Sequence, residues 1–453
     1  MFVNQAERPS GNAVRQQGPS VTGSPSALTN ASQRSLAKTD LEMQTGSGFW
    51  SIYLPYEDPA LDGSIGGVLS APWIPTVRAL AEEDSYLRTA VNACAFAGLG
   101  WIREDYALVQ HGTRLYAQAL RETNTALQDP VRVQSDYVLA CCRVLSLFEM
   151  FRRSAPGDGS RSQVLDWQSH VDGTCRIVQL RGPERHVSGH GLNLYDGVRM
   201  TAIIHGLARR QPNAFTSLPW GLPQDRNMRD ELFDLVGTVP ELFQRIDCFM
   251  ASITQPRIED DRNETLRQGW ELLNRCVTTG DKLCQWETKA LDLCRKSKSL
   301  QNPNSSEAIT GASLDQASLL DVCKAHGDGF FFVCTQYWAV CTKLYSSIRL
   351  LYQRTLSLTE TASSSDPVPQ LPPWVEPESH ALNIACTATH FFRPEAGLWS
   401  AQSAVFPIGT ALFYFARTNR RESAPFKMMT DAFKDNKAGS VMRDFLHNVV
   451  NAK

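Results

Sequence analysis

Apolar side chains recur every three or four positions along most of the chain, the spacing that places them on one face of an α-helix. Segment 136–151 illustrates this, because Val138, Cys141, Leu145 and Phe148 follow one another at that spacing. Runs of alternating apolar and polar residues between turn dipeptides, which are typical of β-strands, are scarce. No fixed-period repeat is evident, which disfavours a regular solenoid. The pattern predicts an all-α fold.

The expected helices follow one another along the chain and are separated by segments rich in Pro, Gly and Ser. Their ranges are 105–129, 136–151, 164–181, 198–211, 229–253, 264–296 and 319–356, and two or three further helices close the chain. The helix over 319–356 is expected to be buried, with a kink at Gly327–Gly329. Polar loops are expected near 299–313 and 359–373.

The first 48 residues differ from the rest in composition. They are rich in Ser, Gln, Asn, Gly and Pro and have almost no apolar periodicity. Such a segment buries too little apolar surface to offset the entropy of ordering it. The sequence therefore predicts a disordered polar tail over 1–48 and a large helical domain over 49–453.

Charge and hydropathy narrow the range of partners. The 45 Lys and Arg residues nearly balance the 47 Asp and Glu residues. This balance argues against binding to nucleic acid or anionic lipid driven by the overall charge of the protein. The chain opens without the apolar run of a secretory signal. Its most apolar window, Gly329–Cys341, is too short to span a bilayer. An intracellular protein that does not enter a membrane is expected.

Candidate metal ligands are few. The twelve cysteines form no C-x-x-C motif. His186, His190 and His205 come nearest to a metal cluster, but the Ser and Gly residues between the first two predict a loop, so solvated loop histidines are the preferred interpretation. Five cysteines are expected to be small buried residues of apolar helices: Cys141, Cys142, Cys175, Cys334 and Cys341. No metal or cofactor site is predicted.

The sequence contains none of the common catalytic motifs: no G-x-S-x-G elbow, P-loop, G-x-G-x-x-G turn or H-E-x-x-H helix. No catalytic residue is assigned, and a non-enzymatic protein is expected. Aromatic residues gather in the second half, where either apolar core or an apolar ligand pocket would explain them, and core is favoured. They are Phe330, Phe331, Phe332, Tyr337, Trp338, Phe391, Phe392 and Trp399.

Segment Trp167–Pro183 carries the most specific pattern in the chain, W-x-x-H-x-x-G-x-x-x-I-x-x-L-R-G-P, and its closing Gly-Pro is a helix stop. A predicted helix pair precedes it over 115–151. Segment 385–417 adds a helix, a connection and a next helix that begins with "FP-[IL]-x-x-A". In their order and spacing, these three segments resemble the regulatory region of fungal binuclear zinc-cluster transcription factors, and the resemblance extends over roughly residues 50 to 450. The matching residues outside the last segment are Leu120, Leu127, Leu139, Leu145, Glu149, Trp167, His170, Gly173, Ile177, Leu180, Arg181, Gly182 and Pro183.

The resemblance implies an all-helical module that serves regulation and contacts with a dimer mate or another partner, not catalysis. Within the motif, Trp167 and Ile177 are expected to anchor the helix in the core. Gly173 is expected to permit close helix approach. His170 is expected to cap or pack against a neighbouring helix.

The chain departs from the family in one respect. The family's DNA-binding head needs six cysteines in paired C-x-x-C-x6-C arrangements that share zinc ions, whereas the first cysteine here is Cys94. No direct sequence-specific DNA contact is therefore expected. The leading hypothesis is a nuclear, non-enzymatic transcriptional regulator or co-regulator that binds another transcription regulator or forms homo- or heterodimers. Control of a secondary-metabolite gene cluster follows by analogy alone.

Other hypotheses stay open. Aromatic residues of the second half could form a pocket for a small-molecule effector, which would make the protein a sensor. An accessory protein of a biosynthetic pathway on a helical scaffold is another alternative. A zinc cluster encoded upstream of a misassigned start would also account for the missing head.

Overall fold

The computed structural model describes residues 41–42, 44–54, 71–152, 161–213, 215, 227–253, 260–301, 328–360 and 369–451. Within these ranges the chain forms α-helices and short 3-10 helices, and none of the residues described is in a strand. The predicted all-α fold is confirmed.

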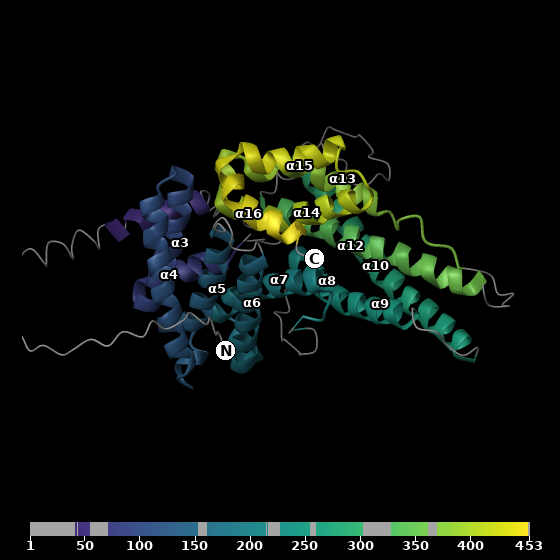
Figure 1. The fold of residues 1–453 in the computed structure, drawn as a ribbon, viewed down its shortest axis with the longest axis horizontal. Coiled ribbons are helices and arrows are strands. Elements are labelled where there is room, and N and C mark those ends of the chain that lie inside the picture. Colours follow the sequence, from purple (N-terminus) through teal and green to yellow (C-terminus); the bar gives the residue numbers. More distant parts are fainter. Residues whose placement is uncertain are drawn as a thin grey trace, which may run out of the picture.

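The elements follow the chain in a simple order (Figure 1). After a helical segment over 44–53 come α2 (Trp73–Glu83), α3 (Ser85–Arg103), α4 (Tyr106–Leu127), η1 (Arg132–Gln134), α5 (Asp136–Phe151), α6 (Arg161–Arg181), η2 (Pro183–His186) and α7 (Gly189–Arg209). The second half contains α8 (Met228–Gly237), α9 (Val239–Ile253), α10 (Asp260–Gln301), α12 (Asp328–Glu360), α13 (Pro377–Thr387), η3 (Ala388–Phe392), η4 (Pro394–Ala396), α14 (Gly397–Arg417), α15 (Ala424–Asp435) and α16 (Lys437–Asn451).

Helices α3 and α4 form a closely packed hairpin. Glu104 turns the chain with a left-handed φ of 59°, and the Asp105 side chain caps α4 by accepting hydrogen bonds from backbone N–H groups of its first turn. Farther along, a Cβ at Gly112 would lie 2.8 Å from the Ala93 carbonyl oxygen and from the Ala97 nitrogen. The two backbones can approach this closely because position 112 has no side chain.

Helix α5 lies at the centre of the first half. It packs against α2, α3, α4, α6, α7 and α16, and every residue from Val138 to Phe151 is buried. A helix that is apolar on most of its circumference can be stable only when other elements surround it. Two charged residues, Arg143 and Glu149, are buried within this run.

The second half is built on the long pair α10 and α12, which Figure 1 shows projecting side by side away from α3 and α4. Helix α12 also packs against α13 and α14, and α14 packs against α15 and α16. The C-terminal helix α16 returns to the first half, where it contacts α3, α5 and α6. Helices from both ends of the chain therefore share one apolar core.

Several predicted boundaries were wrong. Residues 44–48 are helical, so order begins before residue 49; positions 1–40 of the predicted tail lie outside the described residues. The helix expected over 198–211 already begins at Gly189, and the helix expected over 264–296 runs from Asp260 to Gln301. Residues 302–327 lie outside the described ranges, and with them the rest of the first loop and Gly327 of the expected kink.

The second predicted loop, over 359–373, is partly correct. Residues 359–360 still belong to α12, residues 361–368 lie outside the described ranges, and 369–373 are not helical. Among the helices described, none combines the length and the apolar character that a bilayer crossing needs.

Candidate functional site

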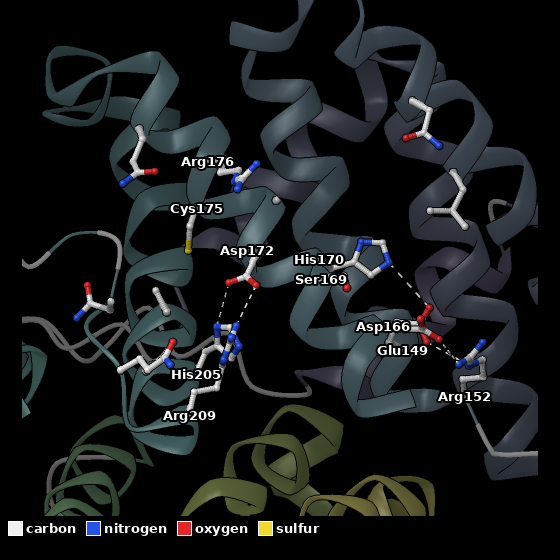
Figure 2. A pocket seen from close by; sticks show the side chains of 18 of the residues that line it. Glu149, Arg152, Asp166, Ser169, His170, Asp172, Cys175, Arg176, His205 and Arg209 are labelled. Carbon is white, nitrogen blue, oxygen red and sulfur yellow. Dashed lines mark hydrogen bonds and ion pairs between the residues drawn. The ribbon is translucent and has the colours of Figure 1, made fainter. Parts of the chain in front are cut away.

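A polar cleft of about 980 Å³ opens between α4, the end of α5, α6 and α7 (Figure 2). Helix α6 supplies much of its wall through Asp166, Ser169, His170, Gly173 and Arg176. Asp166, Ser169 or His170, Gly173 and Arg176 follow one another at intervals of three or four residues and therefore lie on one face of the helix. The face carries the histidine and glycine of the motif that singled out this segment.

The other face of α6 holds the helix in the core. Trp167, Val171 and Val178 are buried there, and the Trp167 ring meets Phe445 of α16 edge-on, with ring centroids 5.7 Å apart. Ile177 is also buried. Trp167 and Ile177 anchor the helix, as predicted.

A hydrogen-bonded group of three side chains lies beneath the cleft. Tyr116 of α4 donates a short hydrogen bond to Oε1 of Glu149 on α5. Its hydroxyl oxygen also lies 2.9 Å from Nε2 of His170 on α6, so His170 packs against a neighbouring helix, as predicted. The group joins three helices that are far apart in the sequence.

Burial sets the protonation of this group. It raises the pKa of Glu149 from 4.5 to about 7 against the opposing effects of Arg152 and the Tyr116 hydrogen bond. Burial likewise lowers the pKa of His170 from 6.5 to about 4. At neutral pH the imidazole is therefore neutral, while the Glu149 carboxyl titrates in the neutral range and not in the usual acidic one.

The two states of Glu149 require opposite hydrogen-bond directions. When Glu149 is ionised, the Tyr116 hydroxyl donates to the carboxylate, and the Tyr116 hydroxyl oxygen accepts a hydrogen bond from His170 Nε2–H. When Glu149 is protonated, its hydroxyl donates to the Tyr116 oxygen, and Tyr116 then donates to His170 Nε2. With the proton of neutral Glu149 on Oε1, a change in protonation reverses both hydrogen bonds without moving a heavy atom.

Arg152, which follows α5, connects this buried group to the cleft surface. Its Nε lies 3.1 Å from Glu149 Oε2, and it donates a hydrogen bond of 2.7 Å to Asp166 Oδ2. The Arg152 side chain is 36 % exposed, whereas that of Glu149 is only 2 % exposed. A molecule in the cleft would therefore meet Arg152 and Asp166 before it met Glu149.

A second charged group lies across the cleft (Figure 2). Asp172 of α6 faces two side chains of α7: its Oδ1 lies 3.3 Å from His205 Nδ1, and its Oδ2 accepts a hydrogen bond of 3.4 Å from Arg209. Burial lowers the pKa of His205 while the Asp172 charge opposes that shift. The His205 ring also stands edge-on to Trp167 at 5.9 Å, so it links the cleft wall to the core face of α6.

Two further arginines face the cleft without a carboxylate partner. Arg121 of α4 and Arg176 of α6 are exposed cleft residues, and none of the carboxylates described forms an ion pair with either. The negatively charged residues Asp166 and Asp172 are already paired with arginine. The cleft surface therefore offers unpaired positive charge.

The predicted solvated loop histidines are wrong for two of the three residues. His186 and His205 are buried, and His186 Nδ1 lies 3.0 Å from the carbonyl oxygen of Gly191. His190 is exposed on the first turn of α7, which is a helix and not the expected loop. In the described part of the chain, no group of three or more His, Cys, Asp or Glu residues could hold a metal ion.

The predicted cysteines and the other residues of the Trp167–Pro183 motif differ in burial and surroundings. The five cysteines expected in apolar helices are all buried. Gly173 lies on the cleft wall, Leu180 is exposed, and Arg181 is buried in an ion pair with Asp136. Sequence reasoning did not single out Tyr116, Arg152 or Asp166, since no local pattern marks contacts made between separate helices.

Comparisons with known proteins add one partial similarity. No family model matches the chain, and no solved structure matches it. A curated protein of Emericella nidulans, the uncharacterized protein AN5342, is 34% identical over 115 residues. The match covers 25% of this chain and 23% of that protein, so the chain spans about a quarter of the relative's length.

Proposed function

We propose that the protein is a non-enzymatic, nuclear transcriptional regulator or co-regulator that acts through protein–protein contacts at the polar cleft. The observation that best supports this proposal concerns α6, the helix with the W-x-x-H-x-x-G motif. One face of α6 anchors it in the core, and its other face forms a wall of the cleft. A helix that both stabilises the fold and shapes an open surface is what a regulatory module for partner binding requires.

The side chains of the cleft are better suited to binding a partner than to acid–base catalysis. Its most perturbed carboxyl group, Glu149, is engaged by Tyr116 and Arg152 and is almost fully covered. A general acid or base must instead reach the reacting atom within hydrogen-bond distance. Arg121 and Arg176 are exposed on the cleft, and arginines bind carboxylates well through their planar donor geometry.

The unpaired Arg121 and Arg176 define the kind of partner. An acidic segment of another regulator, or of a second copy of this chain, would supply carboxylates to these two arginines. Complementary charge chiefly raises the rate and the specificity of association. We propose that the genes under the control of this protein form a secondary-metabolite gene cluster.

Chromatin immunoprecipitation of the tagged full chain tests the proposal. Wild-type protein is expected at a defined set of promoters, and the double variant Arg121→Glu/Arg176→Glu is expected to lose that occupancy. The matched control is Arg275→Glu, an exposed arginine on α10, which Figure 1 places on the opposite side of the molecule from α4. The control is expected to retain wild-type occupancy.

Two outcomes would overturn the proposal. Absence of promoter occupancy, with the protein spread through the cytoplasm, would exclude a role in transcription. Binding of purified protein alone to the same promoters, with strong salt dependence, would show that it contacts DNA directly and does not rely on a partner.

A further inference from the structure

A second hollow, an apolar cavity of about 360 Å³, lies on the opposite face of α6 from the polar cleft. Its walls come from α2, α5, α6, α7, α8, α12, α14 and α16, and aromatic rings dominate them. The main ring contributors include Trp73, Trp167, Phe332, Trp399, Phe406 and Phe445. Phe332 and Trp399 belong to the aromatic set singled out in the sequence, while Phe330, Phe331, Tyr337, Trp338, Phe391 and Phe392 are buried core residues that do not line it.

The cavity walls carry one positive charge in excess. Among the described residues of these walls, the charged ones are Arg143, Asp196 and Arg229, and Arg229 forms an ion pair with Asp196. Arg143 has no carboxylate partner among the residues that the structure describes. An apolar cavity with a single unbalanced charge is an unusual feature, because burying a lone charge is costly.

Arg143 is held in place by contacts that leave its charge uncompensated. Only 7 % of the residue is exposed. Its guanidinium stacks over the Trp73 ring at 4.5 Å and donates a hydrogen bond of 3.1 Å to the Ser146 hydroxyl. Its Nε is buried and makes no hydrogen bond with any residue that the structure describes. These contacts orient the group but supply no negative charge.

The other polar side chains of the cavity could position a ligand without neutralising Arg143. Gln402 accepts a hydrogen bond from the Tyr53 hydroxyl, which fixes the orientation of its amide. Gln168, Thr201 and Ser403 also line the wall. A few fixed polar groups in a largely aromatic wall are typical of a small-molecule site, and 360 Å³ falls in the usual size range.

We propose that this cavity binds an aromatic monocarboxylic acid, whose carboxylate pairs with Arg143 and whose ring packs among the aromatic side chains. Arginine binds a carboxylate through two parallel N–H···O hydrogen bonds, and such bonds are strong where water is excluded. Flat aromatic walls favour a ring over a flexible chain, because ring pairs gain energy beyond burial alone. The observations behind this proposal are separate from those behind the function proposed for the polar cleft.

Isothermal titration of the full chain with 2-naphthoate and with neutral 2-naphthamide tests the proposal. Naphthoate is expected to bind the wild-type protein at least about tenfold more tightly than the amide. Arg143→Met, which keeps the apolar length of the side chain, is expected to abolish that preference while still binding the amide. Arg143→Lys is expected to retain part of the preference for the acid.

Unfolding of the same proteins without ligand gives an independent readout. Arg143→Met removes an uncompensated buried charge and is expected to unfold at an equal or higher temperature than wild type. Should Arg143→Met not fold, Met200→Trp in the otherwise wild-type chain provides the test. Met200 lines the cavity, so the larger side chain is expected to abolish binding of both probes.

Each contrary result overturns a defined part of the proposal. Equal affinity of wild type for acid and amide, or a preference that survives Arg143→Met, would exclude Arg143 as the carboxylate partner. If neither probe bound at concentrations up to about 1 mM, the site would be excluded; a Kd of about 1 mM corresponds to a binding free energy of roughly −4 kcal/mol. Binding of dodecanoate but not naphthoate would exclude the aromatic class.

Discussion

Replacing Glu149 with Gln should make the stability of the protein less dependent on pH. Burial raises the pKa of Glu149 from 4.5 to about 7 in the folded state. The folded state therefore holds this proton more tightly than the unfolded chain does. The resulting stabilisation is fully present below pH 4.5 and is lost as the pH rises through about 7.

The size of the effect follows from that difference in pKa. At about 1.4 kcal/mol for each pKa unit, the rise from 4.5 to about 7 corresponds to about 3 kcal/mol. A glutamine at this position keeps a side chain of similar shape but has no proton to lose. The free energy of unfolding of wild type relative to Glu149→Gln should therefore fall by up to about 3 kcal/mol between acidic and mildly alkaline pH.

Urea unfolding followed by tryptophan fluorescence measures this difference at a series of pH values. His170 titrates in the opposite sense, because its lowered pKa stabilises the fold above 6.5 and the stabilisation is lost as the pH falls through about 4. Since His170 is present in both proteins, the comparison isolates Glu149. Glu271→Gln, at a position where the side chain is 62% exposed, serves as the control. A difference between wild type and Glu149→Gln that stays constant with pH would refute the reasoning.

Two further substitutions test the packing that positions the cleft. Gly112→Ala should destabilise the protein by about 1–3 kcal/mol, because the new Cβ would lie 2.8 Å from backbone atoms of Ala93 and Ala97; a urea midpoint equal to that of wild type would contradict the close α3–α4 crossing. Trp167→Ala should cost about 3–5 kcal/mol, because it removes a buried ring that contacts Phe445 and His205. Calorimetry checks that loss, and a melting temperature unchanged from wild type would show that Trp167 does not anchor α6.

Helical periodicity predicted the parts of the fold that depend on local sequence. The spacing of Val138, Cys141, Leu145 and Phe148 predicted α5, and all four residues are buried. Trp167 and Val171 likewise lie on the core face of α6. These predictions succeed because a residue's face on a helix follows from its spacing alone.

The start of α7 could not be predicted in this way. Gly189 and Gly191 suggested a loop, yet Gly191 lies inside α7, where a Cβ would collide with the carbonyl oxygen of Arg185. The glycine is there because η2 packs directly against the helix, a contact between segments. Single-sequence reasoning takes such a residue as a sign of flexibility.

The buried charged residues of the two hollows are visible in the sequence of α5. Arg143 and Glu149 interrupt a helix that is otherwise apolar nearly all round. A charge in such a helix must be buried, and a buried charge requires a partner from another element or from a ligand. In the structure Glu149 meets Tyr116 and Arg152, whereas Arg143 lines the apolar cavity and pairs with none of the carboxylates described.

Helix α6 borders both hollows, and this position relates the two proposals physically. Trp167 lines the apolar cavity and stands edge-on to His205 at 5.9 Å. His205 in turn holds Asp172 on the wall of the polar cleft. If the proposed ligand shifted the Trp167 ring on binding, the shift would reach Asp172 through one intervening side chain, His205. Because such coupling is reciprocal at equilibrium, any factor by which the ligand alters partner affinity must equal the factor by which the partner alters ligand affinity.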